Sequence, residues 1–222
     1  MGWKTLYSVD ESFFHDLYNR GEKWGDLTPY NVYVDSEEHY GAGVITGEPV
    51  RFQESPRIQH AVGKTRITID FVFFCSADAH GEARIGIVFF KDGESAKDPQ
   101  GADWHGVAYI VDSAPGSDIA DKHQMVVEQE NGMVVVRVDG EKVMEFQLEL
   151  PLSSFAVDID IPEASGTLYS GIGIVVTGVR AEYYDWMEDV VKQMTTMMYI
   201  MMWVTMIVTM ISLVVKVFRG KR

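Results

Sequence analysis

The chain of 222 residues contains one cysteine, Cys75, and its first thirty residues contain no apolar run of the kind found in a secretion signal. A single cysteine allows neither an intrachain disulfide nor a thiolate-rich zinc or iron–sulfur site, which excludes a disulfide-stapled secreted module. Without an apolar segment near the start, the usual export signal is not expected. Stability must come from packing, for which 46% apolar and 12% aromatic residues suffice.

Basic residues are scarce, with 19 Lys+Arg against 33 Asp+Glu and a net charge of -14. Four of them form a basic tail: Lys216, Arg219, Lys221 and Arg222. The first 215 residues therefore carry 15 basic against 33 acidic residues. A domain this acidic repels the phosphates of nucleic acid, so we expect no nucleic acid binding by the main domain.

Motifs for catalysis and metal binding are also missing. The six histidines are dispersed without an H-E-x-x-H pair, and neither a G-x-S-x-G elbow nor the glucanase pattern E-x-D-x-x-E occurs. We expect no catalytic residues, no metal site, no cofactor and no enzymatic activity. One alternative stays open, because the loop at residues 112–121 offers oxygen ligands for calcium, although not at EF-hand spacing.

One long hydrophobic run is present. From Gln193 to Val215 the chain has 23 residues without a charge, glycine or proline. At about 1.5 Å per residue such a helix is roughly 34 Å long, enough to cross a hydrocarbon core of ~30 Å. Its four threonines can return their hydroxyls to carbonyls of the preceding turn. The run predicts a single-pass transmembrane helix that places the chain in a lipid bilayer as an integral membrane protein.

Methionine is concentrated in this run, which holds seven of the twelve in the chain. Thioether side chains pack adaptably, and a tryptophan near the middle of a span favours a protein neighbour over bare lipid. We expect packing against another membrane helix through Met201, Met202, Trp203, Met206 and Met210.

The side of the membrane is left open. Basic flanks tend to stay cytoplasmic, which would place the acidic body outside, yet no export signal is expected. Two interpretations need none: a tail-anchored protein whose body stays where it was made, and a virion membrane protein whose body meets the capsid.

The body is predicted to be an all-β sandwich, because short alternating or aromatic-rich runs follow one another between turn residues. The expected strands are 66–75, 84–90, 107–112, 125–129, 133–138, 142–148, 155–159 and 171–177. Asn131-Gly132 and Asp139-Gly140 supply the positive φ angles of tight hairpin turns. A helix is expected over Glu11–Asn19, capped by Asp10 or Ser8.

Four segments are expected. Residues 1–30 add a strand and a short helix to the sandwich, 31–184 form the β-sandwich domain, 185–218 a linker with the membrane helix, and 219–222 the end of the basic tail. The second helix is predicted to start near Tyr184 and to run unbroken into the membrane span.

The order of these strands resembles the concanavalin A-like lectin/glucanase superfamily, and within it the laminin-G and 3-keto-glycoside-hydrolase-like branches. Val138-Asp139-Gly140-Glu141-Lys142-Val143 matches the strand, turn and strand of that pattern, and Ser170-Gly171-Ile172-Gly173 matches its G-x-I-G strand. The resemblance covers about residues 3 to 186 and implies an antiparallel jelly-roll sandwich. Its motifs are general turn and strand signals, so it carries little about function.

Three functions are compatible with these features. The favoured one is a non-enzymatic, membrane-anchored structural or interaction subunit that docks onto partner proteins of a membrane or capsid assembly. The second is a tethered carbohydrate-binding module, in which exposed aromatic and polar side chains would contact glycan: Trp24, Tyr40, Trp104 and His105. The third is a glycoside-acting hydrolase, which requires two facing carboxyl groups in a cleft.

Overall fold

A computed structural model of the chain describes residues 3–52, 58–59, 63–90, 105–148, 154–166 and 170–219. The chain divides into two compact units, a head of residues Lys4–Tyr183 and a second unit that contains the helix α2 (Trp186–Arg219). The head is mainly β and antiparallel, as predicted, and the long C-terminal helix is present.

The larger sheet of the head has eight strands in the described residues, in the order β11-β10-β9-β6-β13-β3-β2, with β1 paired to β13. In chain order they are β1 (Trp3–Val9), β2 (Thr28–Val34), β3 (Glu37–Thr46), β6 (Thr65–Cys75), β9 (Ile119–Glu130), β10 (Met133–Val138), β11 (Glu141–Gln147) and β13 (Ile172–Tyr184). The first and last strands of the head are thus neighbours in one sheet.

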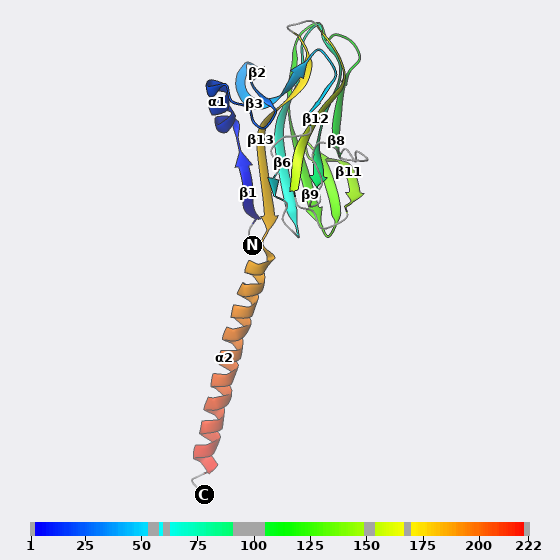
Figure 1. The fold of residues 1–222 in the computed structure, drawn as a ribbon. Helices are drawn as coiled ribbons and strands as arrows, with labels where there is room; N and C mark the ends of the chain where they lie inside the picture. The colour runs from blue at the N-terminus through cyan, green and yellow to red at the C-terminus, as the bar shows by residue number, and fades with distance from the viewer. Residues whose placement is uncertain are drawn as a thin grey trace. The chain divides into compact units, whose positions relative to one another are not determined.

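The smaller sheet runs β4-β12-β7-β8, and β5 also pairs with β12. Its strands are β4 (Val50–Phe52), β5 (Ile58–Gln59), β7 (His80–Phe90), β8 (His105–Val111) and β12 (Ser154–Ser165). Figure 1 shows the two sheets packed face to face, with α1 (Glu11–Arg20) beside the β2–β3 hairpin.

Alternation along the strands builds the core between the sheets. In β6, Ile67 and Ile69 are buried while Arg66 and Asp70 lie on the other face, which is the expected period of two. The smaller sheet supplies the facing apolar layer with Ile85, Ile87, Val157 and Ile159, all at most 1% exposed. Cys75 is buried in the same core, so its thiol is a packing group.

Two predicted hairpin turns are confirmed, and a third was missed. Asn131-Gly132 and Asp139-Gly140 have positive φ at both positions, the conformation that suits a two-residue hairpin. Asp35 and Ser36, which join β2 to β3, adopt φ of 49° and 71° without a glycine. This turn was not predicted from the sequence because serine seldom adopts a positive φ.

The larger sheet curls. β2 contacts β9, although β3, β13 and β6 lie between them in the sheet. The face turned away from the smaller sheet is therefore concave, and part of it is closed by an apolar cluster of Val32, Val34, Val72 and Val175. Gly43 permits the close approach of β3 to β13, since a Cβ there would overlap the Ile174 carbonyl.

Helix α1 begins at the predicted cap. The Asp10 carboxylate accepts hydrogen bonds from the backbone N–H groups of Ser12 and Phe13 at 3.1 and 3.2 Å. Gly21 ends the helix in the left-handed conformation. Phe14 and Leu17 are buried, which attaches the helix to the sandwich.

Helix α2 starts two residues after β13 ends and runs unbroken to Arg219, as predicted. Within it, Val190–Lys216 is a span of 27 residues long and apolar enough to cross a membrane, with a mean hydropathy of 2.2 and none of its apolar window buried. The four threonine hydroxyls donate to carbonyls four residues earlier at 2.8–2.9 Å, which confirms the expected back-bonding.

Candidate functional site

The concave face of the larger sheet holds an open groove of about 1180 Å³. Strands β13, β6, β9 and β10 form its floor, and Ser8–Ser12, from the end of β1 to the start of α1, line it as well. We call this hollow the concave groove. Most of its lining residues are polar or charged, because the outward positions of the floor strands carry charged and hydroxyl side chains, although Val9, Val126 and Val179 line it too.

Two ion pairs cross the floor of the groove. The Arg66 guanidinium donates to Glu182 at 2.8 and 3.1 Å, and Arg137 donates to Glu128 at 2.9 Å. Strand register explains the first pair and its surroundings, since Arg66 stands opposite Glu182 on one side and opposite Glu128 on the other. The carboxylates of Glu182 and Glu128 are therefore each paired with an arginine of a neighbouring strand.

At one end of the groove Asp139 holds His123. The Asp139 carboxylate lies 2.8 Å from His123 Nδ1 and accepts the Gln124 backbone N–H at 2.8 Å. Burial raises the pKa of Asp139, but these two hydrogen bonds outweigh it and the pKa lies below its usual value. The His123 ring also packs against both Phe71 and Tyr109, with centroids 5.5 and 4.8 Å away, and these two rings contact each other at 5.9 Å, so the imidazole is well fixed.

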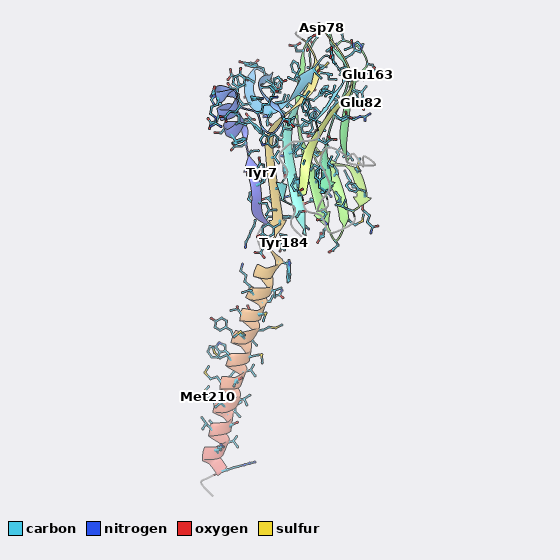
Figure 2. All side chains as sticks on the ribbon, viewed as in Figure 1. Tyr7, Asp78, Glu82, Glu163, Tyr184 and Met210 are labelled. Atoms are coloured by element: carbon cyan, nitrogen blue, oxygen red, sulfur yellow. The ribbon has the colours of Figure 1, made fainter. Side chains whose placement is uncertain are left out.

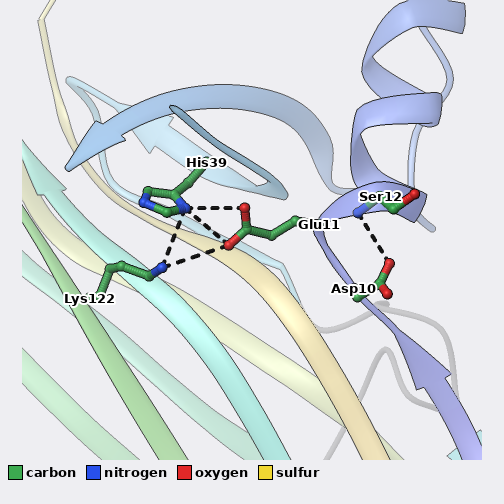
Figure 3. Close-up of polar contacts among 5 residues, drawn as sticks. All are labelled: Asp10, Glu11, Ser12, His39 and Lys122. Carbon is green, nitrogen blue, oxygen red and sulfur yellow. Dashed lines mark hydrogen bonds and ion pairs between the residues drawn. The ribbon is translucent and has the colours of Figure 1, made fainter. Parts of the chain in front are cut away.

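A three-residue contact ties the start of α1 to the concave face (Figure 3). His39 Nδ1 lies 3.0 and 3.1 Å from the two Glu11 carboxylate oxygens and 3.3 Å from Lys122 Nζ. Lys122 is itself 3.8 Å from Glu11. Because Lys122 belongs to β9 and His39 to β3, Glu11 connects two strands that are not neighbours in the sheet.

Of the four residues predicted to contact glycan, the structure describes the side chains of Trp24 and Tyr40. Trp24 was expected to be exposed, which is wrong: it is 4% exposed, donates its indole N–H to Tyr7 Oη at 3.0 Å and packs edge-on against Phe14. An indole ring can lie on a surface or in a core. Trp24 is buried because its apolar ring packs in the core while its N–H group finds a hydroxyl partner. Trp104 lies outside the described residues, and so does the side chain of His105, the first residue of β8.

Tyr40 is half-buried and belongs to a cluster of side chains that the sequence patterns did not predict. We define the tyrosine cluster as Tyr18, Tyr33 and Tyr40 together with Glu38 and His15. Register places Tyr33 opposite Glu38, and both lie on the face of the β2–β3 hairpin opposite that of Val32 and His39. The alternation on either side of Asp35-Ser36 is the signal that could have revealed the cluster.

One acid of the loop at residues 112–121, where calcium was left as an alternative, has a structural contact. Asp118 accepts the backbone N–H of Ala77 at 2.9 Å and thereby fastens a neighbouring turn. Within the ranges that the structure describes, no three His, Cys, Asp or Glu residues are grouped closely enough to hold a metal ion.

The residues predicted for membrane packing all lie on α2. Met201, Met202, Trp203, Met206 and Met210 are between 43% and 70% exposed. Figure 2 shows described side chains projecting from both sides of this helix, with Met210 labelled among them. Lys216 and Arg219, the described part of the basic tail, lie in its last turn.

No protein-family model and no curated protein sequence matches the chain. Among solved structures it is similar to the carbohydrate recognition domain of Emp46p, at 10% identity and a TM-score of 0.43, over 82% of this chain and 98% of that domain. It is also similar to the catalytic domain of a laminarinase, an endo-1,3-beta-glucanase from Thermotoga petrophila RKU-1, at 12% identity and a TM-score of 0.43, over 83% and 99%.

At these identities and TM-scores the likeness carries no conclusion about what this chain binds.

Proposed function

We propose that the protein is a membrane-anchored, non-enzymatic interaction subunit, in which α2 spans a bilayer and the head docks onto partner proteins of a larger membrane or virion assembly. The observation that carries this proposal is the span Val190–Lys216, whose apolar window is unburied within the part of the chain that the structure describes. Water would have to hydrate that whole apolar surface, whereas a bilayer accepts it and the helix satisfies its own backbone.

The groove supports a binding role over a hydrolytic one. Glycoside hydrolysis needs a carboxylic acid whose pKa is raised so that it can donate a proton. Asp139 has a lowered pKa, while Glu182 and Glu128 are engaged by arginines. These three carboxylates are therefore better suited to remain ionised and bind polar groups than to donate a proton.

A tethered glycan-binding module is the second candidate, and the open polar groove favours it. Amide, carboxylate and guanidinium groups on its floor are suited to hydrogen-bond sugar hydroxyls. Binding on a glycan array that Arg66→Ala and Glu182→Gln both abolish would support this candidate. Absence of binding at millimolar glycan would remove it.

Two measurements test the favoured proposal. Membranes that contain the full chain are washed with alkaline carbonate, and the chain is expected to stay in the pellet. It is then extracted in mild detergent and purified, and stoichiometric partner proteins are expected to accompany it. Release by carbonate would contradict the anchor, and purification as a lone chain would contradict the docking role.

A further inference from the structure

The tyrosine cluster is an aromatic surface that the fold leaves uncovered. Tyr33 is 56% exposed and Tyr18 45%, although large aromatic side chains are normally favoured in a core. Both are surface residues of rigid elements, Tyr18 on α1 and Tyr33 on β2. Exposed tyrosines gathered on regular structure are typical of a protein-binding surface.

One carboxylate holds the polar ends of the cluster. Glu38 accepts a hydrogen bond from Tyr33 Oη at 2.6 Å through one oxygen and from Tyr40 Oη at 3.0 Å through the other. Asn31 Nδ2 donates to Tyr40 Oη at 3.3 Å. The hydrogen bonds from Tyr33 and Tyr40 lower the pKa of Glu38, so it stays ionised. The rings are thus ordered before any partner arrives, which reduces the entropy lost on binding.

The rings meet at angles. Tyr18 and Tyr40 have centroids 5.6 Å apart at 63°, and His15 and Tyr40 are 4.4 Å apart at 60°. Stacking on a sugar needs one flat, open ring face, whereas inclined rings around a carboxylate suit a compact cation. Asn19 Nδ2 lies 3.1 Å from His15 Nε2, which holds the imidazole ring beside Tyr40.

Charge in this region also favours a cation. Between Glu11 and Tyr40 the chain carries seven acidic and two basic residues, and one of the two, Arg20, is paired with Glu22 at 3.1 Å. A second copy of the chain would bring the same acidic surface to the contact, so self-association through it is disfavoured.

We infer that the tyrosine cluster is a docking surface for a partner protein segment that presents an arginine or lysine side chain to Glu38 and the surrounding rings. This inference rests on the proposed docking function and names the chemistry of the partner. It concerns the face of the β2–β3 hairpin opposite the concave groove, so the two surfaces are separable by mutation.

A peptide titration tests the inference. A fluorescein-labelled peptide of alternating arginine and glycine is added to the full chain in detergent micelles at about 0.15 M salt, where distant charges are screened. Glu38→Gln, and Tyr18→Ala combined with Tyr33→Ala, are each expected to weaken binding about fivefold or more. The same peptide with neutral citrulline in place of arginine is expected not to bind.

The matched control is Glu141→Gln, which removes an exposed carboxylate from β11 and should change affinity by less than about twofold. No binding of the arginine peptide overturns the inference, as does an equal loss in Glu141→Gln, which would indicate diffuse attraction to the acidic head. Displacement of the peptide by a neutral glucan oligosaccharide, or oligomerisation that the tyrosine variants abolish, overturns it too. Carbonate resistance and partner co-purification are measured separately, so the proposed function can survive these outcomes.

Discussion

At the scale of the residue, burial decided roles that residue type left open. Trp24 and Tyr33 are both aromatic and both come from the N-terminal part of the chain, yet the first is 4% and the second 56% exposed. Trp24 contacts Phe14 and Tyr7, so it stabilises the attachment of α1 and β1 to the sandwich. Tyr33 adds little to the core and is available to a partner.

Replacement of Trp24 by Ala should therefore cost stability and leave binding surfaces in place. We expect a loss of about 3–5 kcal/mol in the free energy of unfolding, as for other large buried aromatics. Urea unfolding of a fragment of residues 1–185 measures it. Tyr33→Ala in the same fragment is the control and should cost less than about 1 kcal/mol; equal losses in the two variants would contradict the assigned roles.

Asp139 predicts a pH dependence. Its pKa in the folded head lies below the ordinary value of 3.8, so the ionised carboxylate stabilises the fold. That contribution is present above the unfolded-state pKa and disappears as the pH falls through the folded-state pKa. Asp139→Asn tolerates the same positive φ of 51° but removes the charge opposite His123.

At pH 7 we expect Asp139→Asn to lower the free energy of unfolding by about 0.5–1 kcal/mol, a modest value because the carboxylate is half exposed. Urea midpoints at decreasing pH measure the difference, which should vanish once the wild-type carboxyl is protonated. A difference that grows toward acidic pH would show that the sign is wrong.

At the scale of the element, glycine serves two separate purposes. Gly140 occupies a hairpin turn at a φ of 85° with open space around its missing Cβ. Gly43 lies in β3, where the missing Cβ lets the backbone of β13 approach. Position 140 requires a backbone conformation with positive φ, whereas position 43 requires a residue without a Cβ atom.

Alanine should separate these purposes. Gly140→Ala is expected to cost about 1 kcal/mol, the strain of a left-handed alanine. Gly43→Ala should cost more, about 2–3 kcal/mol, because the strands must move apart in the curled sheet. Thermal unfolding of the two variants gives the order, and a reversed order would contradict the close approach of β3 and β13.

At the scale of the whole molecule, the head and α2 treat their apolar side chains differently. The head buries them between two sheets, whereas the apolar window of α2 is unburied within the described structure, and the proposed anchor would place it in a bilayer. A fragment that ends at Asp185 should consequently be soluble and give a β-type circular dichroism spectrum.

A charge within the span tests the anchor. Met206→Arg should raise the free energy of insertion by ~2.5–3.5 kcal/mol near the middle of a membrane helix. The fraction of full-length chain that resists carbonate extraction should fall accordingly. Met206→Leu, which keeps the hydrophobicity, is the matched control, and an arginine variant retained as fully as wild type would argue against a transmembrane position.

The sequence by itself determined what depends on local pattern. Period-two alternation in RITID, the Asn131-Gly132 and Asp139-Gly140 turns, the Asp10 cap and the uncharged run after Gln193 each act over a few neighbouring residues, so they could be read directly.

Only the tertiary structure decided what depends on residues far apart. The curl that brings β2 to β9, the contact of Glu11 with His39 and Lys122, and the burial of Trp24 join segments up to 111 positions apart. So does the tyrosine cluster, which needs both α1 and the β2–β3 hairpin in place. Long-range packing sets these contacts, and no local pattern encodes which distant partner a side chain meets.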